Sequence, residues 1–395
     1  MRILAVCQYY HPEPFRISDI CESLVNRGHE VTVLTGLPNY PEGFVPTEYR
    51  YGRKRTETVK GVKVIRCFEI GRGKGRLRLF VNYISYTVSA SVKAMLLSKE
   101  YDVIYVHQLS PVLMTVPAIV YKKRSARKIL LYCLDLWPES LAAGGIREGS
   151  LIYKVFLWIS RAIYNSADQI LVTSGMFIKY FADVLLLDSK GIRHLPQYAE
   201  ELYGECASDT RKTSSNYVFA GNIGDMQSVE TIVQAANELR KRREIVFHLV
   251  GDGSKLEYCR QIAKDYKLEN VKFYGRRPLS EMPYYYSMAK AMLVTLRDNK
   301  SLSYTLPGKI QSYMAAGKPI IGAINGEARK VIEEAKCGLC CTAEDYKGLA
   351  RLIEEFEERD DAKQMADNAL GYYQSNYSKE SFVSSLETAL KNLEG

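Results

Sequence analysis

Long apolar runs, clustered metal ligands and paired cysteines are scarce in this 395-residue sequence. The first apolar run, at 3–7, is too short for a secretion signal, and we expect none. The densest later run, at 77–88, is interrupted by Arg78 and by polar residues, which argues against a membrane-spanning helix. The nine cysteines are odd in number and scattered, so we expect reduced thiols in the cytosol.

Patterns that bind metals are also missing. Three cysteines stand within 337–341, but no second Cys or His cluster accompanies them, and we interpret the segment as a packed strand. No Asp-x-Asp motif stands on a loop suited to a divalent ion. We therefore expect neither a resident metal nor a cofactor.

The sequence does contain a regular alternation of apolar runs with segments of helical length. Its length exceeds what one core fills, and 47% hydrophobic with 25% charged residues suits a soluble α/β protein. The alternation predicts two parallel sheets with crossover helices. The first series of expected strands is 3–7, 31–35, 62–67, 103–106, 129–134 and 169–173, and the second is 217–220, 246–250, 271–274, 291–295, 319–324 and 338–341.

A polar stretch at 199–216 separates the two series of strands. We interpret it as the linker between a Rossmann-like domain at 1–198 and a second Rossmann-like domain at 199–377. A last helix, within 378–395, carries apolar residues at helical spacing.

Three glycine-marked turns follow apolar runs of the second series. They are Gly221-Asn222-Ile223-Gly224, Gly251-Asp252-Gly253 and Pro307-Gly308-Lys309. Parallel βα units bring such turns to one edge of a sheet, where backbone N–H groups and helix N-termini face an anionic ligand. A nucleotide diphosphate is the natural occupant of that edge.

Particular side chains of these turns are expected to contact the diphosphate. Gly221 and Gly224 let the backbone pass close to it, although an ordinary tight turn also explains them. Asn222 and Gln227 offer amide donors. Lys309 stands in the predicted first turn of a helix, where its charge and the helix dipole would stabilise the leaving group together. A solvent-exposed lysine is the alternative.

Candidate residues of the first domain follow two of its strands. Asp135 comes directly after the run 129–134 and should hold a sugar hydroxyl or accept a proton, with a helix cap as the alternative. Glu139 is either its partner or a surface charge. His107 ends another strand and is a weaker candidate, with a purely structural role as the alternative. The flanking loops are expected to present His11, Arg16, Asn39 and Tyr40 to an acceptor or a diphosphate.

Motifs in both halves resemble glycosyltransferase family 4. In the second half they are 217–241, 248–253 (His-Leu-Val-Gly-Asp-Gly), 271–275 (Val-Lys-Phe-Tyr-Gly) and 314–320 (Met-Ala-Ala-Gly-Lys-Pro-Ile). In the first half they are 8–14 (Gln-Tyr-Tyr-His-Pro-Glu-Pro), 26–33 (Asn-Arg-Gly-His-Glu-Val-Thr-Val), 38–43 (Pro-Asn-Tyr-Pro-Glu-Gly) and 135–139 (Asp-Leu-Trp-Pro-Glu). The pattern is most similar to the branch that builds bacterial surface polysaccharides, which includes fucosyl and N-acetylfucosaminyl transferases of capsule, O-antigen and colanic acid.

The resemblance implies a retaining enzyme with two Rossmann-like domains that face each other across a cleft, the GT-B architecture. It implies that the last helix crosses back onto the first domain. The implied donor is a UDP-sugar, or less favourably a GDP-sugar, of the acetamido-deoxyhexose or fucose type. The implied acceptor is a saccharide linked to a lipid, polyprenyl diphosphate.

Donor contacts are also implied by the resemblance. Gly275 and Arg276 stand where relatives bind the nucleobase, and the loop Leu306-Pro307-Gly308 could offer backbone amides to the sugar. The paired glutamates of the family are missing, because Tyr304 and Ser312 stand at their positions. Gln311 or Ser312 is therefore expected to bind the ribose hydroxyls.

A basic segment precedes the apolar run at 77–88. Between 48 and 78 there are eleven Lys or Arg residues against three acids. With the apolar and aromatic side chains that follow, this composition predicts an interfacial helix on an anionic membrane, on the cytoplasmic face. A core helix beside a solvated loop is the alternative, and nucleic acid is not an expected partner because no nucleic-acid motif accompanies the patch.

Two other functions share this architecture. A nucleotide-sugar 2-epimerase would bind the same donors, but such enzymes usually lack a basic and apolar element like 50–97. A non-catalytic subunit that binds nucleotide sugars would explain the missing glutamates.

Overall fold

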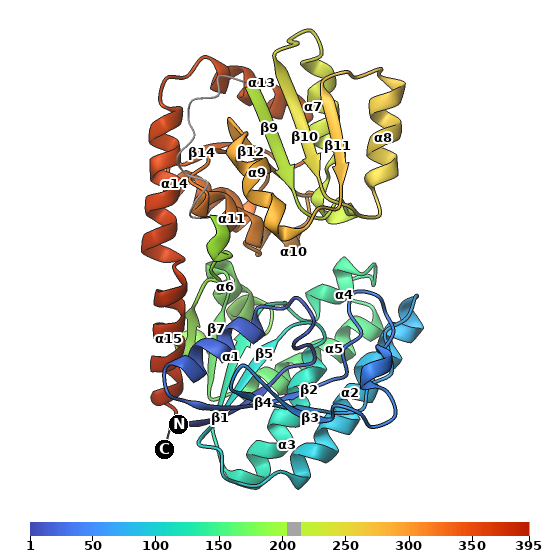
Figure 1. The fold of residues 1–395 in the computed structure, drawn as a ribbon, viewed down its shortest axis with the longest axis vertical. Coiled ribbons are helices and arrows are strands. Elements are labelled where there is room, and N and C mark those ends of the chain that lie inside the picture. The colour runs from blue at the N-terminus through green and yellow to red at the C-terminus, as the bar shows by residue number, and fades with distance from the viewer. Residues whose placement is uncertain (204–214, 395) are drawn as a thin grey trace. The chain divides into compact units, whose positions relative to one another are not determined.

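The computed structural model describes residues 1–203 and 215–394, and within them the chain forms two compact units. Unit 1 comprises Met1–Leu195 with Val383–Gly395, and unit 2 comprises Pro196–Phe382. The linker expected at 199–216 falls mostly on 204–214, which lie outside the described residues. Figure 1 shows a sheet with flanking helices in each unit, which confirms the predicted α/β class.

Unit 1 is built on an eight-stranded sheet of order β3-β4-β2-β1-β5-β6-β7-β8, in which only the β3–β4 pair is antiparallel. Its six predicted strands are all present, and β3 and β8 are additional. The strands are β1 (Arg2–Val6), β2 (Glu30–Thr35), β3 (Thr56–Val59), β4 (Val62–Arg66), β5 (Val103–Gln108), β6 (Ile129–Cys133), β7 (Gln169–Val172) and β8 (Ile192–His194). Lys60 and Gly61 join β3 to β4, both with positive φ, as a two-residue hairpin loop requires.

Helices of unit 1 connect its parallel strands. They are α1 (Ile17–Asn26), α2 (Arg76–Leu96), α3 (Val116–Ser125), α4 (Glu139–Ala143), α5 (Leu151–Asn165) and α6 (Gly175–Asp183), with the short 3-10 helix η2 (Val112–Thr115) after β5. The carboxyl-terminal helix α15 (Lys379–Lys391) joins unit 1 from Val383 onward, where Glu387 accepts hydrogen bonds from Arg27 and His29.

Unit 2 contains a six-stranded parallel sheet of order β11-β10-β9-β12-β13-β14. Numbered from its first strand this order is 3-2-1-4-5-6, the doubly wound Rossmann order, in which ligands bind where the order reverses, between β9 and β12. The strands are β9 (Ser215–Ala220), β10 (Ile245–Val250), β11 (Val271–Gly275), β12 (Ala291–Thr295), β13 (Ile320–Ala323) and β14 (Gly338–Cys341). All six were predicted, and β14 confirms that the cysteine-rich segment is a packed strand.

The helices of unit 2 follow its strands in sequence. They are α7 (Glu230–Glu238), α8 (Leu256–Asp265), α9 (Met282–Ser287), α10 (Lys300–Ser303), α11 (Gly308–Ala315), α12 (Gly326–Glu334), α13 (Tyr346–Glu357) and α14 (Ala362–Asn376).

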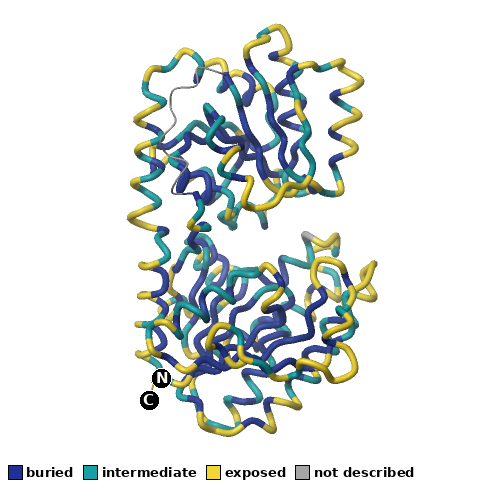
Figure 2. The backbone as a smooth tube through the Cα atoms, viewed as in Figure 1, coloured by how far each residue is buried: buried dark blue, intermediate teal, exposed yellow. Residues whose placement is uncertain are grey.

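Each sheet forms the buried centre of its unit (Figure 2). In β9, Tyr217 and Phe219 belong to one apolar cluster, while Val218 and Ala220 belong to the other. Successive side chains of a strand point to opposite faces, so helices cover this sheet on both sides. Continuous apolar runs are therefore the sequence pattern of these strands.

Candidate active site

The glycine-marked turns of unit 2 lie side by side at the carboxyl ends of its strands. The backbone N–H of Gly221 donates to the Val250 carbonyl at 2.9 Å, and that of Gly251 donates to the Gly275 carbonyl at 2.9 Å. The Ile223 N–H donates to the Asp252 carbonyl, also at 2.9 Å. These bonds join the ends of β9, β10 and β11 into one backbone surface at the expected edge.

Close backbone approach explains two of the glycines. Gly251 has φ +145°, and a Cβ atom there would lie 1.8 Å from the Gly221 carbonyl oxygen. A Cβ atom on Gly253 would lie 2.4 Å from the Ile223 carbonyl oxygen. Because no side chain fits at either position, these glycines are needed by the packing of the turns against each other as well as by any ligand.

Lys309 lies in the first turn of α11, and its Nζ atom reaches the first glycine turn. A Cβ atom on Gly221 would stand 3.1 Å from this Nζ, and the Phe219 ring centroid is 3.9 Å from it. The Nζ atom is buried and has no hydrogen-bond partner among the described residues. Burial lowers the pKa of Lys309 to about 7. The alternative of a solvated lysine is therefore wrong.

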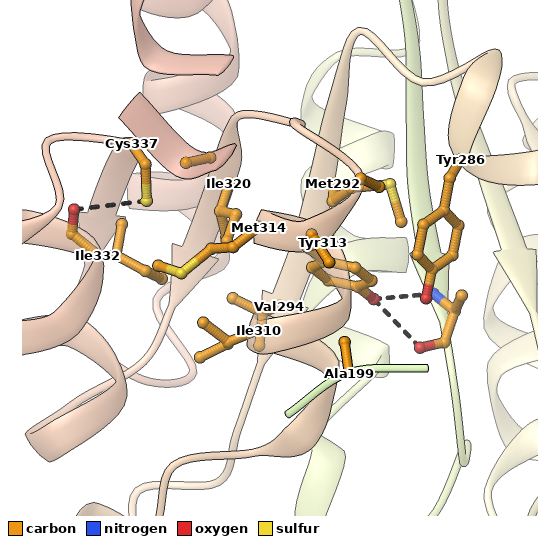
Figure 3. Packing of buried hydrophobic residues seen from close by; sticks show 14 of the residues in the cluster. Ala199, Tyr286, Met292, Val294, Ile310, Tyr313, Met314, Ile320, Ile332 and Cys337 are labelled. Atoms are coloured by element: carbon orange, nitrogen blue, oxygen red, sulfur yellow. Dashed lines mark hydrogen bonds between the residues drawn. The ribbon is translucent and has the colours of Figure 1, made fainter. Parts of the chain in front are cut away.

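Tyr313, one helical turn after Lys309, holds the end of β9 and was not predicted. Its hydroxyl accepts from the Ala220 N–H and donates to the Ala220 carbonyl, both at 3.1 Å, and its ring packs edge-on against Tyr286 (Figure 3). Residues i and i+4 share one face of a helix. The same face of α11 thus positions both the strand end and the lysine beside it.

The amide donors expected in the first turn contact each other. The Asn222 side-chain amide donates to Gln227 Oε1 at 3.1 Å, and both groups are accessible. A ligand anion can compete for the Asn222 amide hydrogens. Gly275 and Arg276 lie on the same edge, since Gly275 accepts from Gly251, and the Arg276 side chain is exposed.

The residues expected to contact ribose are buried on α11. Gln311 is 3% exposed and Ser312 is 7% exposed. The Ser312 hydroxyl donates to the Gly308 carbonyl at 3.3 Å and lies 3.5 Å from a Glu200 carboxylate oxygen. A ribose contact through Ser312 requires these bonds to be exchanged. The preceding residues Leu306, Pro307 and Gly308 are at least partly exposed, as a loop that offers backbone amides must be.

Asp135 of unit 1 follows β6 and joins two loops. Its Oδ2 atom accepts from the backbone N–H and the hydroxyl of Ser110, both at 2.9 Å, and the Trp137 indole N–H donates to the same hydroxyl at 3.1 Å. Burial raises the pKa of Asp135. The carboxylate thus orders the loop after β5 rather than capping a helix, and it stays partly exposed at the edge of the sheet.

Two of the expected residues of unit 1 are enclosed in the core instead. Glu139 is not a surface charge, because it is buried and accepts from the hydroxyls of Tyr153 at 2.7 Å and Tyr180 at 3.0 Å. His107 is 1% exposed, and burial lowers its pKa to about 3. His107 therefore stays neutral at ordinary pH, and its burial favours a purely structural role over contact with an acceptor.

Asn39 positions the acceptor-side loops from inside a buried network. Its side chain donates to the Leu37 carbonyl at 2.9 Å and to Glu69 at 3.3 Å, and it accepts from the Arg72 N–H at 3.1 Å. Burial raises the pKa of Glu69 to about 8 and that of nearby Glu13 to about 7. The polar groups of Asn39 are already bonded, so the residue orders the loops and does not face the acceptor.

Of the candidate residues on these loops, His11 and Tyr40 are exposed, and Arg16, directly before α1, is half-buried. The centroid of the Tyr40 ring lies 5.1 Å from that of the Phe15 ring. The guanidinium carbon of Arg72 lies over the Tyr40 ring, 5.2 Å from its centroid. An exposed aromatic ring beside a cation is a surface on which an anionic or sugar group can bind.

The basic segment and the apolar run after it each differ from expectation at one residue. Arg66 is buried, where it donates to Glu57 at 2.6 Å and to the His11 carbonyl at 2.7 Å. Tyr86, which belongs to the apolar run at 77–88 that we expected to face a membrane, is also buried and donates to the Cys7 carbonyl at 2.9 Å. The helix α2 does present Leu77 and Phe80 to solvent. Among the described residues, no helix combines the length and apolarity needed to cross a membrane.

The parts of the chain that the structure describes contain no group of three or more His, Cys, Asp or Glu side chains arranged to hold a metal ion.

Family comparisons match both halves of the chain. Residues 15–196 match the family model described as a glycosyl transferase 4-like domain, and residues 207–371 match that of glycosyl transferases group 1. The probable glycosyltransferase WbjE of Pseudomonas aeruginosa is 28% identical over 63% of this chain and 64% of its own length, so the chain aligns with less than two thirds of that relative. The putative colanic acid biosynthesis glycosyl transferase WcaI of Escherichia coli K12 is 21% identical over 90% of this chain and 88% of its own length.

Solved structures share the fold at low sequence identity. Anabaena Alr3699/HepE in complex with UDP superposes with a TM-score of 0.73 at 16% identity, covering 99% of this chain and 100% of the other. WaaG, a glycosyltransferase of lipopolysaccharide biosynthesis, superposes with a TM-score of 0.66 at 14% identity over 100% of both chains. With the Rossmann strand order of unit 2 and the matches to both halves, the chain belongs to the glycosyltransferases of the GT-B fold, with a 4-like amino-terminal domain and a group 1 carboxyl-terminal domain.

Proposed function

We propose that the protein is a retaining glycosyltransferase that moves a sugar from a UDP-sugar to a lipid-linked saccharide in surface polysaccharide synthesis. The observation that carries the proposal is the buried, unpartnered Nζ atom of Lys309 beside the Gly221 turn. A buried cation without a counter-charge is costly unless an anion arrives to pair with it. A sugar nucleotide brings a diphosphate to this edge.

Transfer breaks the bond between the sugar C1 and the diphosphate oxygen and forms a bond from C1 to an acceptor hydroxyl on the same face. Charge develops on the leaving diphosphate, where Lys309 and the backbone N–H groups of the glycine turns stabilise it. The acceptor hydroxyl loses its proton, and Asp135 is the proposed group that holds or receives it. Burial raises the pKa of Asp135, which makes its carboxylate a better proton acceptor.

Names of similar proteins support the choice of substrates. WcaI is named for colanic acid biosynthesis, and HepE was solved with UDP and with UDP-glucose. We propose UDP rather than GDP as the nucleotide, an acetamido-deoxyhexose or fucose type of sugar, and polyprenyl diphosphate as the lipid. We place the enzyme on the inner face of the cell membrane.

A panel of UDP- and GDP-sugars tests the proposal by measurement of free nucleotide and of the sugar product. Fast nucleotide release that depends on a lipid-linked acceptor is the expected result. A sugar changed in place without acceptor would instead indicate a 2-epimerase. Binding of nucleotide sugar with neither reaction would indicate a non-catalytic subunit.

Transfer should not depend on a divalent metal. In this proposal the cationic Lys309 and the backbone amides of the glycine turns neutralise the diphosphate, which is the role a Mg²⁺ ion has in other transferases. Turnover in excess EDTA should stay within about twofold of the untreated value. Turnover that EDTA abolishes and Mg²⁺ or Mn²⁺ restores would show that the diphosphate site is incomplete.

Binding of UDP should take up a proton above pH 7. Free Lys309 has a pKa of about 7, and a bound diphosphate favours its charged form. The terminal phosphate of UDP ionises near pH 6, so between pH 7 and 9 the lysine dominates the pH dependence. Affinity should fall by up to about tenfold per pH unit. Calorimetry in two buffers of different ionisation enthalpy measures the uptake, and a flat affinity profile for the wild type would contradict it.

Membrane docking should depend on the basic turn before α2. Arg72, Lys74, Arg76 and Arg78 lie within seven residues, beside the exposed Leu77 and Phe80. Charge attracts the unit to an anionic leaflet over about a Debye length, and the apolar contact persists in salt. Sedimentation with vesicles should rise with anionic lipid and fall only partly at high salt.

The variant with those four residues replaced by Ser should bind anionic vesicles more weakly and lose more transfer to a lipid-linked acceptor than to a short soluble one. A control variant removes the same charge from exposed positions of unit 2, namely Arg240, Lys241, Arg243 and Lys264. Equal vesicle binding by the wild type and the first variant would mean that the patch is ordinary solvated surface.

A further inference from the structure

An apolar pocket of about 580 Å³ lies in unit 1 between α2, α4 and α5. Both α2 and α5 pack on η2, which supplies Leu113 to the wall. Phe80, Tyr83, Trp137 and Phe156 supply aromatic surface. The volume falls within the range of roughly 300–1,000 Å³ that small-molecule sites occupy. None of the residues assigned above to the donor contributes to this pocket.

The inner end of the pocket reaches the predicted acceptor edge. Ser110 lines the pocket and donates two hydrogen bonds to Asp135, and Trp137 lines it and donates to Ser110. One end of a molecule that fills the pocket therefore lies beside Ser110, which is bonded to the Asp135 carboxylate that we propose to hold the acceptor hydroxyl.

The outer rim of the pocket is cationic and apolar. Arg76 belongs to the lining and is exposed, and it is the first residue of α2. Around the rim, Leu77 is 78% exposed and Ile152 is 55% exposed. Exposed apolar side chains that continue from an apolar pocket favour a binding surface over ordinary exterior. The rim therefore suits an apolar chain that leaves the pocket toward an anionic surface.

We propose that this pocket binds the isoprenoid chain of the acceptor next to its diphosphate, with the diphosphate and the saccharide at the inner end toward Asp135 and the chain leaving the pocket past Arg76 at the rim. The inference rests on the proposed function, because it gives the lipid-linked acceptor its own site in unit 1. An isoprenoid chain fits because its methyl-branched, uncharged units match the apolar and aromatic wall.

The test uses Trp137 as a local reporter. The only other tryptophan, Trp158, is 71% exposed on α5 and is replaced by Phe in every protein used. Saturating UDP is present to occupy the donor edge. The probes are farnesyl diphosphate and inorganic pyrophosphate, with fluorescence of Trp137 as the readout. A buried methylene raises affinity about fourfold, so farnesyl diphosphate should bind at least tenfold more tightly than pyrophosphate.

A matched pair of variants separates the pocket from the surrounding surface. Ile152→Asp places a charge in the lining, whereas Val155→Asp places the same charge one turn further on α5, at a residue that is outside the lining and 46% exposed. Ile152→Asp should weaken farnesyl diphosphate binding at least tenfold and leave pyrophosphate binding unchanged. Val155→Asp should change neither by more than about twofold. Both positions are largely solvent-exposed, so the variants should fold.

Three outcomes would overturn the inference. Equal affinity for the two probes would mean that the apolar wall takes no part. Equal losses in the two variants would assign the effect to the whole face of α5. Quenching of Trp137 by anionic vesicles without any prenyl lipid, as strong as that by farnesyl diphosphate, would assign the pocket to membrane acyl chains.

The experiment also separates this inference from the proposed function. If the pocket assignment fails, transfer still occurs, but the KM for the acceptor does not depend on the length of its lipid chain. If the proposed function fails, no acceptor supports transfer, yet farnesyl diphosphate still binds beside Trp137.

Discussion

Lys309→Ala should lower turnover at least about 100-fold and leave both units folded. Removal of one preorganised donor to a developing negative charge costs about 10²- to 10³-fold in other enzymes. The Nζ atom of Lys309 is buried at the first glycine turn and lacks a hydrogen-bond partner among the described residues, so its N–H groups are available to the diphosphate. Initial rates at saturating donor and acceptor measure the effect.

Thermal unfolding separates this loss from a loss of structure. Only the Phe219 ring offsets the desolvation of this buried cation, which has no counter-charge beside it, so the variant should unfold within a few degrees of the wild type. Lys300→Ala, which removes an exposed lysine of the neighbouring helix α10, should keep at least half of the activity. Near-normal turnover by folded Lys309→Ala would show that the diphosphate is stabilised elsewhere.

The strand framework could be predicted because parallel strands covered on both faces are continuous apolar runs. This holds for the central strands, such as β1, β5 and β6 of unit 1 and β9, β10 and β12 of unit 2, whereas β4 and β11 each carry an exposed lysine. The strand β3 was missed because it reads Thr-Glu-Thr-Val, is half exposed and lies in a basic stretch. Its pairing with β4 depends on the turn at Lys60-Gly61. In the sequence nothing distinguishes this lysine from the other basic residues around it.

The glycine turns could be predicted for a different reason. A turn that directly follows a strand of a parallel sheet must lie at the carboxyl edge of that sheet. Neighbouring parallel strands therefore bring such turns together. The contacts of Tyr313 and Ser110 could not be predicted in this way. Tyr313 bonds Ala220, 93 residues away, and Ser110 bonds Asp135, 25 residues away. Neither residue belongs to a local pattern, so only the packed structure reveals its role.

The sequence pattern also could not predict which individual polar residues are buried. His107 and Glu139 stand at or near strand ends, where exposure is expected, yet tyrosine hydroxyls enclose both. Glu69 is the clearest case. It lies in a loop after β4, but Gln8, Asn39 and Asn82 bond its carboxylate in the interior, where burial raises its pKa to about 8. The three partners come from three separate segments of the chain.

Gly251→Ala should destabilise unit 2 by about 2–6 kcal/mol and weaken UDP binding at least tenfold. The backbone at Gly251 has φ +145°, a conformation that costs a residue with a Cβ about 1–3 kcal/mol. The new Cβ would also lie 1.8 Å from the Gly221 carbonyl oxygen, so one turn must move away from the other. Forced repacking of this kind adds about 1–3 kcal/mol. Denaturant unfolding and calorimetry with UDP measure the two effects.

Gly371→Ala is the matched control, with the opposite expected sign. Gly371 lies in the helix α14 of the same unit, is exposed, and has no heavy atom within 4 Å of an added Cβ. Alanine in the interior of a helix is favoured over glycine by about 0.5–1 kcal/mol, so this variant should be more stable and bind UDP as the wild type does. The same chemical change would therefore separate a glycine that the turns require from one that the helix merely tolerates. Equal stability of the two variants would mean that the turns can separate at little cost, and the close contact of Gly221 with Gly251 would then not be what shapes the diphosphate site.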